Sequence, residues 1–554
     1  MFQFTTTTAL LILLGFYGVT FLLTLRIGKK QENADGYMTA NGSVGYGMSA
    51  ASMTATWIWA ASFYAAASSG YKYGLSGAIH YGFWGALMIL FIYPFGRRFR
   101  ELAPNASTLA EIMHARHGAS SQMILAGSNV VGSVISLMVN FTAAGALVAI
   151  LSPLSFVQGV MIAGFGVLSY TLWSGFRASV FTDFAQLVAM ILAAVIIIPM
   201  IFFKLGGPTL FETGMANLSL EQQDFFSTTA ILEQGAPFFV AVLAYAIGNQ
   251  TIAQRLFAVR EDLIKSSFIT ATIGYGSIVI GLGMLGLLAL LAGITPIDGD
   301  LNNLIPQMAA TYLPPFMVAM LFIMVIGSLS STADSDLSAL SAIVMTDVYG
   351  KHITNNNPDP NKLLWVGRLT MVVAATLGVL FASLKLDILS MLIFVGALWG
   401  SIVFPVIASL YWDRVTNSAF TVSVAVSFLL FLIVRFDWLP IEGAIAVFFE
   451  ILAAVGGGVV IGLMSFGFFG RMTGLILGTL TALVLVFFTV GFLRDYTVLM
   501  SSLTAYGAST LICTMMTLRS NAPRFDFAKI DQRVIEFHVE EEATTPSATA
   551  QAKV

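Results

Sequence analysis

The stretch GSLSSTADSDLSALSAIVMTD, Gly327 to Asp347, sets three aspartates among serines and threonines in a chain that is otherwise strongly apolar. The residues before it, PPFMVAMLFIMVI, are almost pure hydrocarbon. A polar group inside a membrane helix is costly and normally faces a cavity or a partner. The stretch therefore predicts a membrane helix whose polar side chains have a task inside the protein.

The composition is that of an integral membrane protein. Of 554 residues, 57% are hydrophobic and 10% are charged, and the mean hydropathy is +0.86. Apolar runs of 18 residues or more recur along the chain, and each is long enough to cross a bilayer as a helix. We predict an all-α integral membrane protein with about 15 transmembrane helices. The predicted segments are 7–26, 44–68, 76–96, 121–151, 156–174, 178–204, 236–257, 264–292, 313–348, 362–384, 387–411, 416–435, 440–469, 471–493 and 497–518.

The distribution of Lys and Arg predicts the orientation in the membrane. The first apolar segment has no positive residue before it, whereas Arg26, Lys29 and Lys30 follow it, so its N-terminus is expected outside the cell. On this topology only five of the 26 Lys and Arg residues fall in outer loops, as the positive-inside rule requires. We predict a multi-pass protein of the inner or plasma membrane, with the N-terminus outside and the C-terminus in the cytoplasm.

Four parts follow from this topology. Residues 1–43 form the first helix and a cytoplasmic loop, 44–411 the transport core, 412–518 additional transmembrane helices, and 519–554 a charged cytoplasmic tail that we expect to be partly disordered. The single cysteine, Cys513, excludes an intrachain disulfide. The chain has neither a phosphate loop nor a nucleophile–base motif, so we expect no enzyme and no ATP-driven pump. The basic residues follow the topology and form no nucleic-acid patch.

Two hydrophobic segments are interrupted, and they lie five segments apart. The second, VGYGMSAASMTATWIWAASF, begins with small residues that form a continuous helix poorly, and the seventh has Gly248-Asn249-Gln250 at its centre. Interrupted helices at matching positions of two halves indicate a transporter built from inverted repeats. Segments 2–6 and 7–11 then form a core of 5+5 helices.

The opening stretch suits a monovalent cation. Ser328, Ser331 and Thr332 are spaced i, i+3, i+4 and so share one helical face. Hydroxyls and freed carbonyls supply oxygen ligands without a net charge that would hold the ion too tightly. Asp334 and Asp336 lie about one turn further toward the cytoplasm, where they would draw the ion out. The alternative is that such hydroxyls bond back to the helix and let helices pack closely, which we favour for Ser335, Ser338 and Ser341.

At these residues the chain resembles the sodium/solute symporter family, over nearly all of residues 40–420. Three motifs carry the resemblance, in the family's order and on the expected helices. They lie at Thr182, Asp183 and Gln186; at Tyr245, Asn249, Gln250, Gln254 and Arg255; and at Ser331, Thr332, Ser335, Leu337, Ser341, Asp347 and Tyr349. A family threonine is replaced by Met345, and the usual Gly-Gly pair before the first motif is Ser174-Gly175.

The resemblance implies a LeuT-like core and Na⁺-coupled uptake by alternating access, with Na⁺ as the coupling ion. It implies as sodium ligands the hydroxyls of Ser331 and Thr332 and the carbonyls of Ser328, Ala51 and Thr54. It places Asp183 on the inward exit path of the ion, where the position of Asp334 on its helix predicts a second carboxylate. In sugar-transporting relatives, the residue at Tyr245 closes the substrate from the cytoplasm.

One branch of the family is especially similar, the urea-active transporters. TWIWAAS, SSGYKYGLSG and ELAPNASTLAEIMHARHG match that branch, as does the number of helices. The departures lie near the expected substrate site. The branch's acid and aromatic pair are lost in Asn249-Gln250-Thr251-Ile252-Ala253-Gln254-Arg255, and its Ala-Glu-Leu is Ser335-Asp336-Leu337. These departures are compatible with a substrate other than that of the urea-active branch.

The broken middles of segments 2 and 7 are expected to face each other beside the ion. They offer Trp57 or Trp59, Tyr245, Asn249 and Gln250 as pocket lining. Indole faces suit a flat solute or a cation, and amides suit a solute rich in N–H and C=O groups. The two tryptophans are two residues apart, about 200° on a helix, so we expect only one of them to face the pocket.

These observations favour a Na⁺-coupled symporter for a small polar solute, with urea-like molecules ahead of amino acids, carboxylates and sugars. Two alternatives stay open. One is a proton-coupled variant in which Asp334 or Asp336 titrates, and the other is an uncoupled facilitator or sensor with the same fold.

Overall fold

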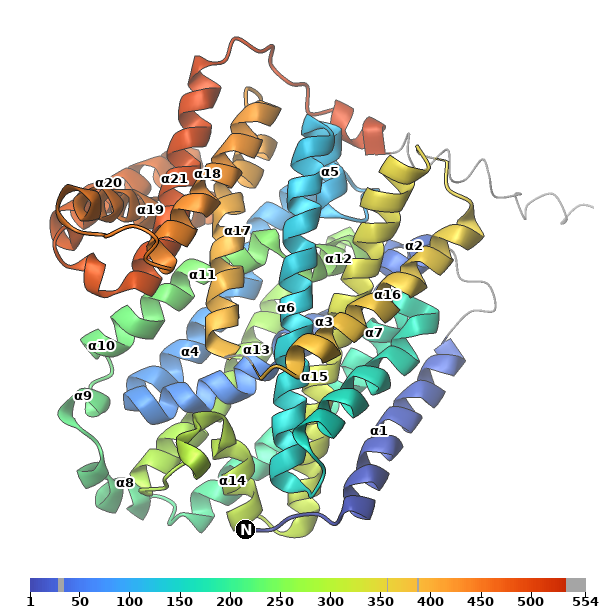
Figure 1. Ribbon diagram of the computed structural model, residues 1–554, viewed down its shortest axis with the longest axis vertical. Helices are drawn as coiled ribbons and strands as arrows, with labels where there is room; N and C mark the ends of the chain where they lie inside the picture. Colours follow the sequence, from blue (N-terminus) through green and yellow to red (C-terminus); the bar gives the residue numbers. More distant parts are fainter. Residues whose placement is uncertain (28–33, 356, 386–387, 535–554) are drawn as a thin grey trace, which may run out of the picture.

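Most of the described part of the chain is helical. The computed structural model describes residues 1–27, 34–355, 357–385 and 388–534. Within them thirteen helices are long and apolar enough to cross a membrane, and no strand is formed. The N-terminus lies at the lower end of the molecule, and the helix that ends at Arg519 finishes at the upper end (Figure 1).

The helices follow one another with short connections. Their bounds are α1 Thr6–Ile27, α2 Ala34–Thr39, α3 Tyr46–Trp57, α4 Ala60–Leu102, α5 Leu109–His117, α6 Ala119–Leu151, α7 Phe156–Lys204, α8 Thr209–Gly214, α9 Leu220–Gln223, α10 Thr228–Ala230, α11 Ala236–Gly248, α12 Gln250–Ala258, α13 Ile264–Leu291, α14 Leu304–Tyr312, α15 Pro315–Ile343, α16 Pro360–Ala382, α17 Ile388–Tyr411, α18 Asn417–Arg435, α19 Gly443–Phe469, α20 Arg471–Thr489 and α21 Thr497–Arg519. A π-helix, Val344–Ile353, extends α15.

Two of the long helices bend sharply at a glycine, which accounts for the difference between thirteen helices and the 15 predicted segments. Gly74 in α4 has φ 64° and ψ −138°, and Gly175 in α7 has φ 51° and ψ −129°. Beside the first bend the Ser69 hydroxyl donates to the carbonyl of Gly77 over 2.8 Å, although the two residues are eight apart. Each helix therefore turns back and supplies two of the predicted segments.

Both predicted interruptions are present. The small-residue half of the second segment forms α3, and the break follows at Ile58 and Trp59, before α4 begins. The second break is at Asn249, between α11 and α12, where the backbone is extended. The Asn249 side chain accepts a hydrogen bond from the Thr251 amide over 2.8 Å and so caps the new helix.

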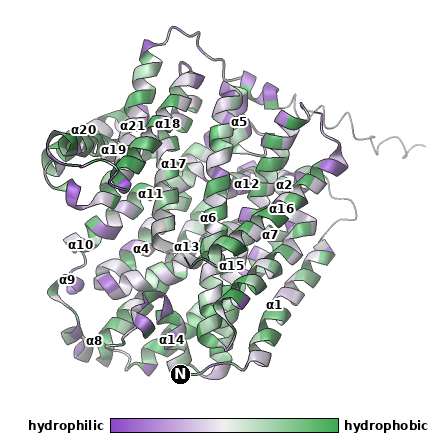
Figure 2. Cartoon of the chain, viewed as in Figure 1, coloured by the Kyte–Doolittle hydropathy of each residue, from purple (hydrophilic) through white to green (hydrophobic). Residues whose placement is uncertain are grey.

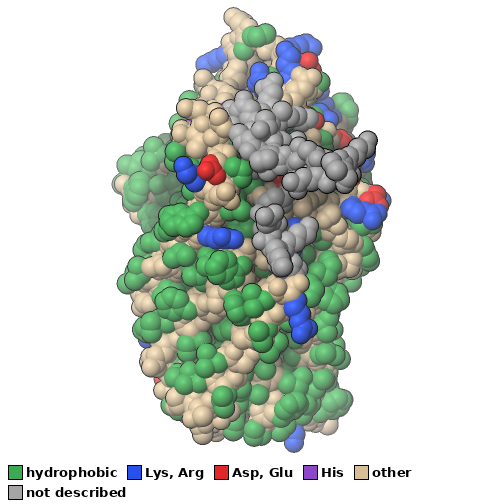
Figure 3. Space-filling model, turned by 90° about the vertical axis from the view of Figure 1, so that its right-hand side faces the viewer, with side chains coloured by type: hydrophobic (Ala, Val, Ile, Leu, Met, Phe, Trp, Pro, Cys, Tyr) green, Lys and Arg blue, Asp and Glu red, His purple; other side chains and the backbone are tan. Residues whose placement is uncertain are grey.

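The outer surface is suited to lipid. Hydrophobic residues run along the long helices, while hydrophilic residues gather mostly at helix ends and connections (Figure 2). On one face, apolar side chains are spread over the lower half, with polar side chains and backbone between them, and Lys and Arg lie mainly in the upper half (Figure 3). On α20 the Phe487 side chain is 84% exposed. This composition and helix length fit a multi-pass membrane protein.

The first part of the C-terminal tail packs against the upper end of the helical core. The Arg116 guanidinium on α5 lies 4.2 Å from the ring centroid of Phe525, and Ile530 and Val534 are buried. Arg533 donates to the carbonyl of Ala115 over 2.7 Å. Apolar and stacking contacts therefore hold this part of the tail. The tail was expected to be only partly disordered, and its residues 535–554 lie outside the described residues.

The bend in α7 yields a stability prediction. A Cβ at Gly175 would lie 2.6 Å from the carbonyl oxygen of Tyr37, and the positive φ there suits glycine alone. We expect Gly175→Ala to lower the free energy of unfolding by about 1–3 kcal/mol through backbone strain, with the clash adding to it. Thermal unfolding of the purified protein in detergent measures this. Gly127→Ala on α6, where a Cβ meets no atom within 4 Å, is the control. Equal melting temperatures of the two variants would contradict the prediction.

Candidate functional site

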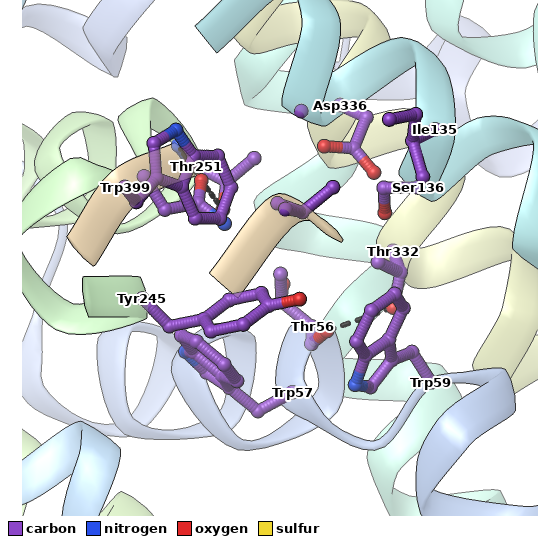
Figure 4. Close-up of a pocket in the computed structure, with 13 residues that line it drawn as sticks. Thr56, Trp57, Trp59, Ile135, Ser136, Tyr245, Thr251, Thr332, Asp336 and Trp399 are labelled. Atoms are coloured by element: carbon purple, nitrogen blue, oxygen red, sulfur yellow. Dashed lines mark hydrogen bonds between the residues drawn. The ribbon is translucent and has the colours of Figure 1, made fainter. Parts of the chain in front are cut away.

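Hydroxyls of α15 meet the carbonyls freed where α3 ends. The last carbonyls of a helix have no partner inside it. Thr332 Oγ1 donates to the carbonyl of Thr56 over 2.7 Å (Figure 4), and the Ser328 hydroxyl donates to the carbonyl of Ile58. The serines and threonines of α15 therefore stabilise the interruption that their own helix faces.

A buried ion pair lies beside these hydroxyls. Arg255 on α12 and Asp183 on α7 are joined by a hydrogen bond of 2.9 Å from Nη2 to Oδ2, and both side chains are fully buried. The Ser331 hydroxyl donates to Oδ1 of Asp183, and the Ser52 hydroxyl donates to Oδ2 over 2.5 Å. Arg255 also donates to Ser335 over 2.7 Å. Four elements, α3, α7, α12 and α15, thus meet in one network.

A second buried carboxylate, Asp334, lies on the α7 side of α15. It accepts hydrogen bonds from the Tyr170 hydroxyl over 2.7 Å, from Ser179 over 2.5 Å and from Thr182 over 3.3 Å. All three donors lie on α7. Asp334 therefore fastens α15 to α7 on both sides of the bend at Gly175.

The residues predicted to bind sodium lie on α15 and α3, and those on α3 lie at different distances from the break. Ser328, Ser331 and Thr332 all face α3 or α7. Thr54 lies in the last turn of α3, and its carbonyl accepts the Ile58 amide over 3.2 Å. Ala51 lies one turn earlier, inside α3 rather than at the break. The interruption, at Ile58 and Trp59, follows the run of small residues instead of lying within it.

A small cavity lies on the other side of α15, between the two broken helices. Trp57 and Trp59 flank the first break, and Asn249 and Thr251 flank the second. The Tyr245 ring lies at the centre of an aromatic cluster (Figure 4), with ring centroids 6.1 Å from Trp57, 6.5 Å from Trp59 and 5.0 Å from Trp399. The cavity is lined by Thr56, Trp57, Trp59, Gly132, Ile135, Ser136, Tyr245, Asn249, Thr251, Thr332, Asp336, Val395 and Trp399.

Two expectations about the pocket need correction. Trp57 and Trp59 both line it, because the helix ends between them and the rotation of 100° per residue no longer applies. Gln250 is not among the lining residues. Its Oε1 accepts from the amide of Leu109 over 3.1 Å, and its Nε2 donates to the carbonyl of Ser107 over 3.0 Å. Its amide therefore holds the loop before α5 rather than facing the cavity.

The sequence did not predict Trp399 as a lining residue, and it predicted one location for Asp334 and Asp336, which the structure places on different sides of α15. Asp336 lines the cavity with Thr332, whereas Asp334 faces α7. The spacing of Thr332 and Asp336, i and i+4, contained this signal, because such residues share a helical face. Trp399 lies in the apolar α17 and offered no comparable signal.

The arrangement of interrupted helices around a buried polar cavity defines a membrane transporter. Comparison with known proteins agrees. The Sodium:solute symporter family matches residues 37–425, so the chain belongs to this family of transporters, which are not enzymes.

Several named transporters are similar to this chain in sequence. A probable urea active transporter of Schizosaccharomyces pombe is 23% identical over 74% of this chain and 66% of its own length. A sodium/pantothenate symporter of Escherichia coli is 25% identical over 73% of this chain and 86% of its own length. A urea-proton symporter of Oryza sativa is 22% identical over 69% of this chain. The chain spans 58% of the length of that rice protein.

Solved structures share the fold. A Na⁺-coupled sialic acid symporter in a substrate-bound outward-open state has a TM-score of 0.66 at 19% identity, covering 86% of this chain and 98% of that one. A nucleobase-cation-symport-1 family transporter in a closed conformation has a TM-score of 0.50 at 15% identity. These likenesses support the inverted-repeat architecture.

The buried ion pair yields a second prediction. We expect Arg255→Gln to lower the free energy of unfolding by about 3–5 kcal/mol, because it leaves the Asp183 carboxylate buried without its counter-charge. The double variant Asp183→Asn/Arg255→Gln is expected to recover part of the loss. Chemical denaturation followed by tryptophan fluorescence measures both.

Arg260→Gln serves as the control, because the Arg260–Asp262 pair lies in solvent and contributes little. A loss for Arg255→Gln no larger than for Arg260→Gln would contradict the prediction.

Proposed function

We propose that the protein is a secondary active transporter that couples Na⁺ entry to the uptake of a small polar solute by alternating access. The observation that carries this proposal is the meeting of Ser328 and Thr332 with the carbonyls at the end of the interrupted α3. Ser331, on the same face of α15, donates to Asp183 beside them. Hydroxyls and carbonyls beside a helix break form the kind of cluster that coordinates a cation in inverted-repeat transporters.

The proposed sodium ligands are the hydroxyls of Ser331 and Thr332 and the carbonyls of Ala51, Thr54 and Ser328. All five are oxygens, which a hard cation prefers. A hydroxyl has one proton and two lone pairs, so it donates and coordinates at once. Ser331 is therefore able to keep its hydrogen bond to Asp183, and Thr332 its bond to Thr56, while their lone pairs face the ion.

Asp183 and Asp334 are proposed to line the inward path of the ion. Each accepts several hydrogen bonds, from α3, α12 and α15 in the first case and from α7 in the second. A cation that leaves Ser331 meets Asp183 next, because their side chains are already hydrogen-bonded. Opening of the inner side then requires α3 or α12 to move relative to α7.

The proposed solute site is the cavity with Trp57, Trp59, Tyr245 and Asn249 in its lining. The named relatives that act on urea, together with the flat aromatic walls, favour a urea-like molecule as the first solute to test. Amino acids, carboxylates and other small metabolites are the alternatives. Gln250 is proposed to act from outside the cavity, through the loop before α5.

Proton coupling is the second candidate mechanism. The observation behind it is the presence of three buried carboxylates, Asp183, Asp334 and Asp336, near one guanidinium. A relative in rice is named as a urea-proton symporter. The ion dependence of uptake separates the two mechanisms.

The proposed orientation places the N-terminus outside and the upper end of Figure 1, with α5 and the first part of the tail, in the cytoplasm. The gathering of Lys and Arg in the upper half of Figure 3 supports this direction. The proposed location is the inner or plasma membrane.

The test is uptake of radiolabelled urea into proteoliposomes with an inward Na⁺ gradient, an inward proton gradient, or neither. We expect accumulation with Na⁺ only. We expect Ser331→Ala to raise the Na⁺ concentration for half-maximal uptake about tenfold, because it removes one ligand and one hydrogen bond to Asp183.

Ser341→Ala is the matched control, since this buried serine on the same helix contacts the Met345 sulfur instead. A proton-driven uptake indifferent to Na⁺ would contradict the sodium site. Equal shifts in both variants would contradict the role of Ser331.

A further inference from the structure

We propose that the cavity binds a small organic cation and that Asp336 is its counter-ion. This inference rests on the proposed transport function and specifies its substrate class. It separates the solute of this chain from a neutral molecule such as urea, which has a similar flat shape but no charge.

Asp336 differs from the other two buried carboxylates. Asp183 is paired with Arg255, and Asp334 accepts three hydrogen bonds from α7. The Asp336 side chain is only 2% exposed and lines the cavity, and its Oδ2 has no hydrogen-bond partner in the described part of the chain. Ser133 and Ser136 of α6 hydrogen-bond to the carboxyl group, and Ser136 is seen beside it in Figure 4, but these bonds leave Oδ2 free. A buried carboxylate oxygen left without a donor is unfavourable, so it favours a ligand that brings one.

When the positive and negative charges around α15 are paired, the carboxylate of Asp336 is left without a counter-charge. α7 and α15 contribute three buried carboxylates, Asp183, Asp334 and Asp336, and one of them, Asp183, is paired with the Arg255 guanidinium. The Na⁺ of the proposed function would be bound at Ser331 and Thr332, beside Asp183, and would offset a second negative charge. The described residues that line the cavity include no Lys, Arg or His. The remaining negative charge is at Asp336.

The walls of the cavity suit a cation. Trp57, Trp59, Tyr245 and Trp399 bring four aromatic rings to the space beside Asp336 (Figure 4). The face of an aromatic ring attracts a cation, and this attraction is largest where water is excluded. A carboxylate among aromatic faces repels an anion and gives a neutral solute only hydrogen bonds.

Two of the residues that line the cavity also have donors without a partner. The indole N–H groups of Trp57 and Trp399 are buried without a hydrogen-bond partner in the described residues. They favour a solute that carries an acceptor, such as a carbonyl or hydroxyl, away from its charged group. The positive end would meet Asp336, and the acceptor would meet the indoles.

Guanidinium and urea form a matched pair of probes, because both are flat and rich in N–H groups and only guanidinium is charged. Binding is measured by tryptophan fluorescence of the purified full-length protein, in the presence of Na⁺ and at millimolar probe concentrations. We expect guanidinium to bind at least about tenfold more tightly than urea. Equal or tighter binding of urea would overturn the inference.

Two substitutions test Asp336 itself. Asp336→Asn keeps the shape and removes the charge, so the preference for guanidinium is expected to disappear through an affinity loss of about tenfold. Asp336→Glu keeps the charge and is expected to retain the preference. A preference that persists unchanged in Asp336→Asn would overturn the assignment of the counter-ion.

Na⁺ titration without solute separates this inference from the function on which it rests. A fluorescence response to Na⁺ in the parent and in Asp336→Asn shows that the variant is folded and that the sodium site is intact. A Na⁺ response without any preference for guanidinium overturns the cation inference and leaves Na⁺ coupling standing. Loss of the Na⁺ response in the parent itself contradicts the sodium site.

Discussion

The buried pair of Asp183 and Arg255 is the constraint on which the rest of the site depends. A charge in a membrane protein interior is stable only when it is paired and hydrogen-bonded. The pair meets this requirement by drawing Ser52, Ser331 and Ser335 around it, from α3 and α15. Helices far apart in the sequence are thereby held at one point, beside the hydroxyls proposed to bind Na⁺.

The interruptions between α3 and α4 and between α11 and α12 leave backbone groups free to bind side chains near the Asp183–Arg255 pair. A continuous helix uses its carbonyls internally, whereas a broken one presents them to neighbours. Thr56 and Ile58 present carbonyls that the hydroxyls of α15 occupy. The same breaks redirect the chain so that Trp57 and Trp59 reach one cavity. The polar network and the aromatic cavity thus lie on two sides of the same helix, α15, next to which both the ion and the solute are proposed to bind.

The motifs identified the family and the helices of the site, because residue types that are costly in lipid are easily recognised in an apolar chain. The break in the seventh segment was predicted within Gly248-Asn249-Gln250, since these residues interrupt an apolar run, and the structure has it at Asn249. The break in the second segment was not located. The freed carbonyl of Ile58 accepts the Ser328 hydroxyl of another helix, a contact that the local sequence does not reveal. The Gly74 and Gly175 bends were predicted only as loops between segments.

The sequence by itself determined the membrane class, the succession of apolar segments, the two interrupted helices and the polar face of α15. These follow from composition and from periodicity within one helix. Only the tertiary structure decided that Asp334 faces α7 while Asp336 lines the cavity, that Gln250 binds the loop before α5, and that Trp399 completes the aromatic walls. Helical periodicity fixes which residues share a face, but the neighbour that each face meets is set by packing between helices distant in the sequence.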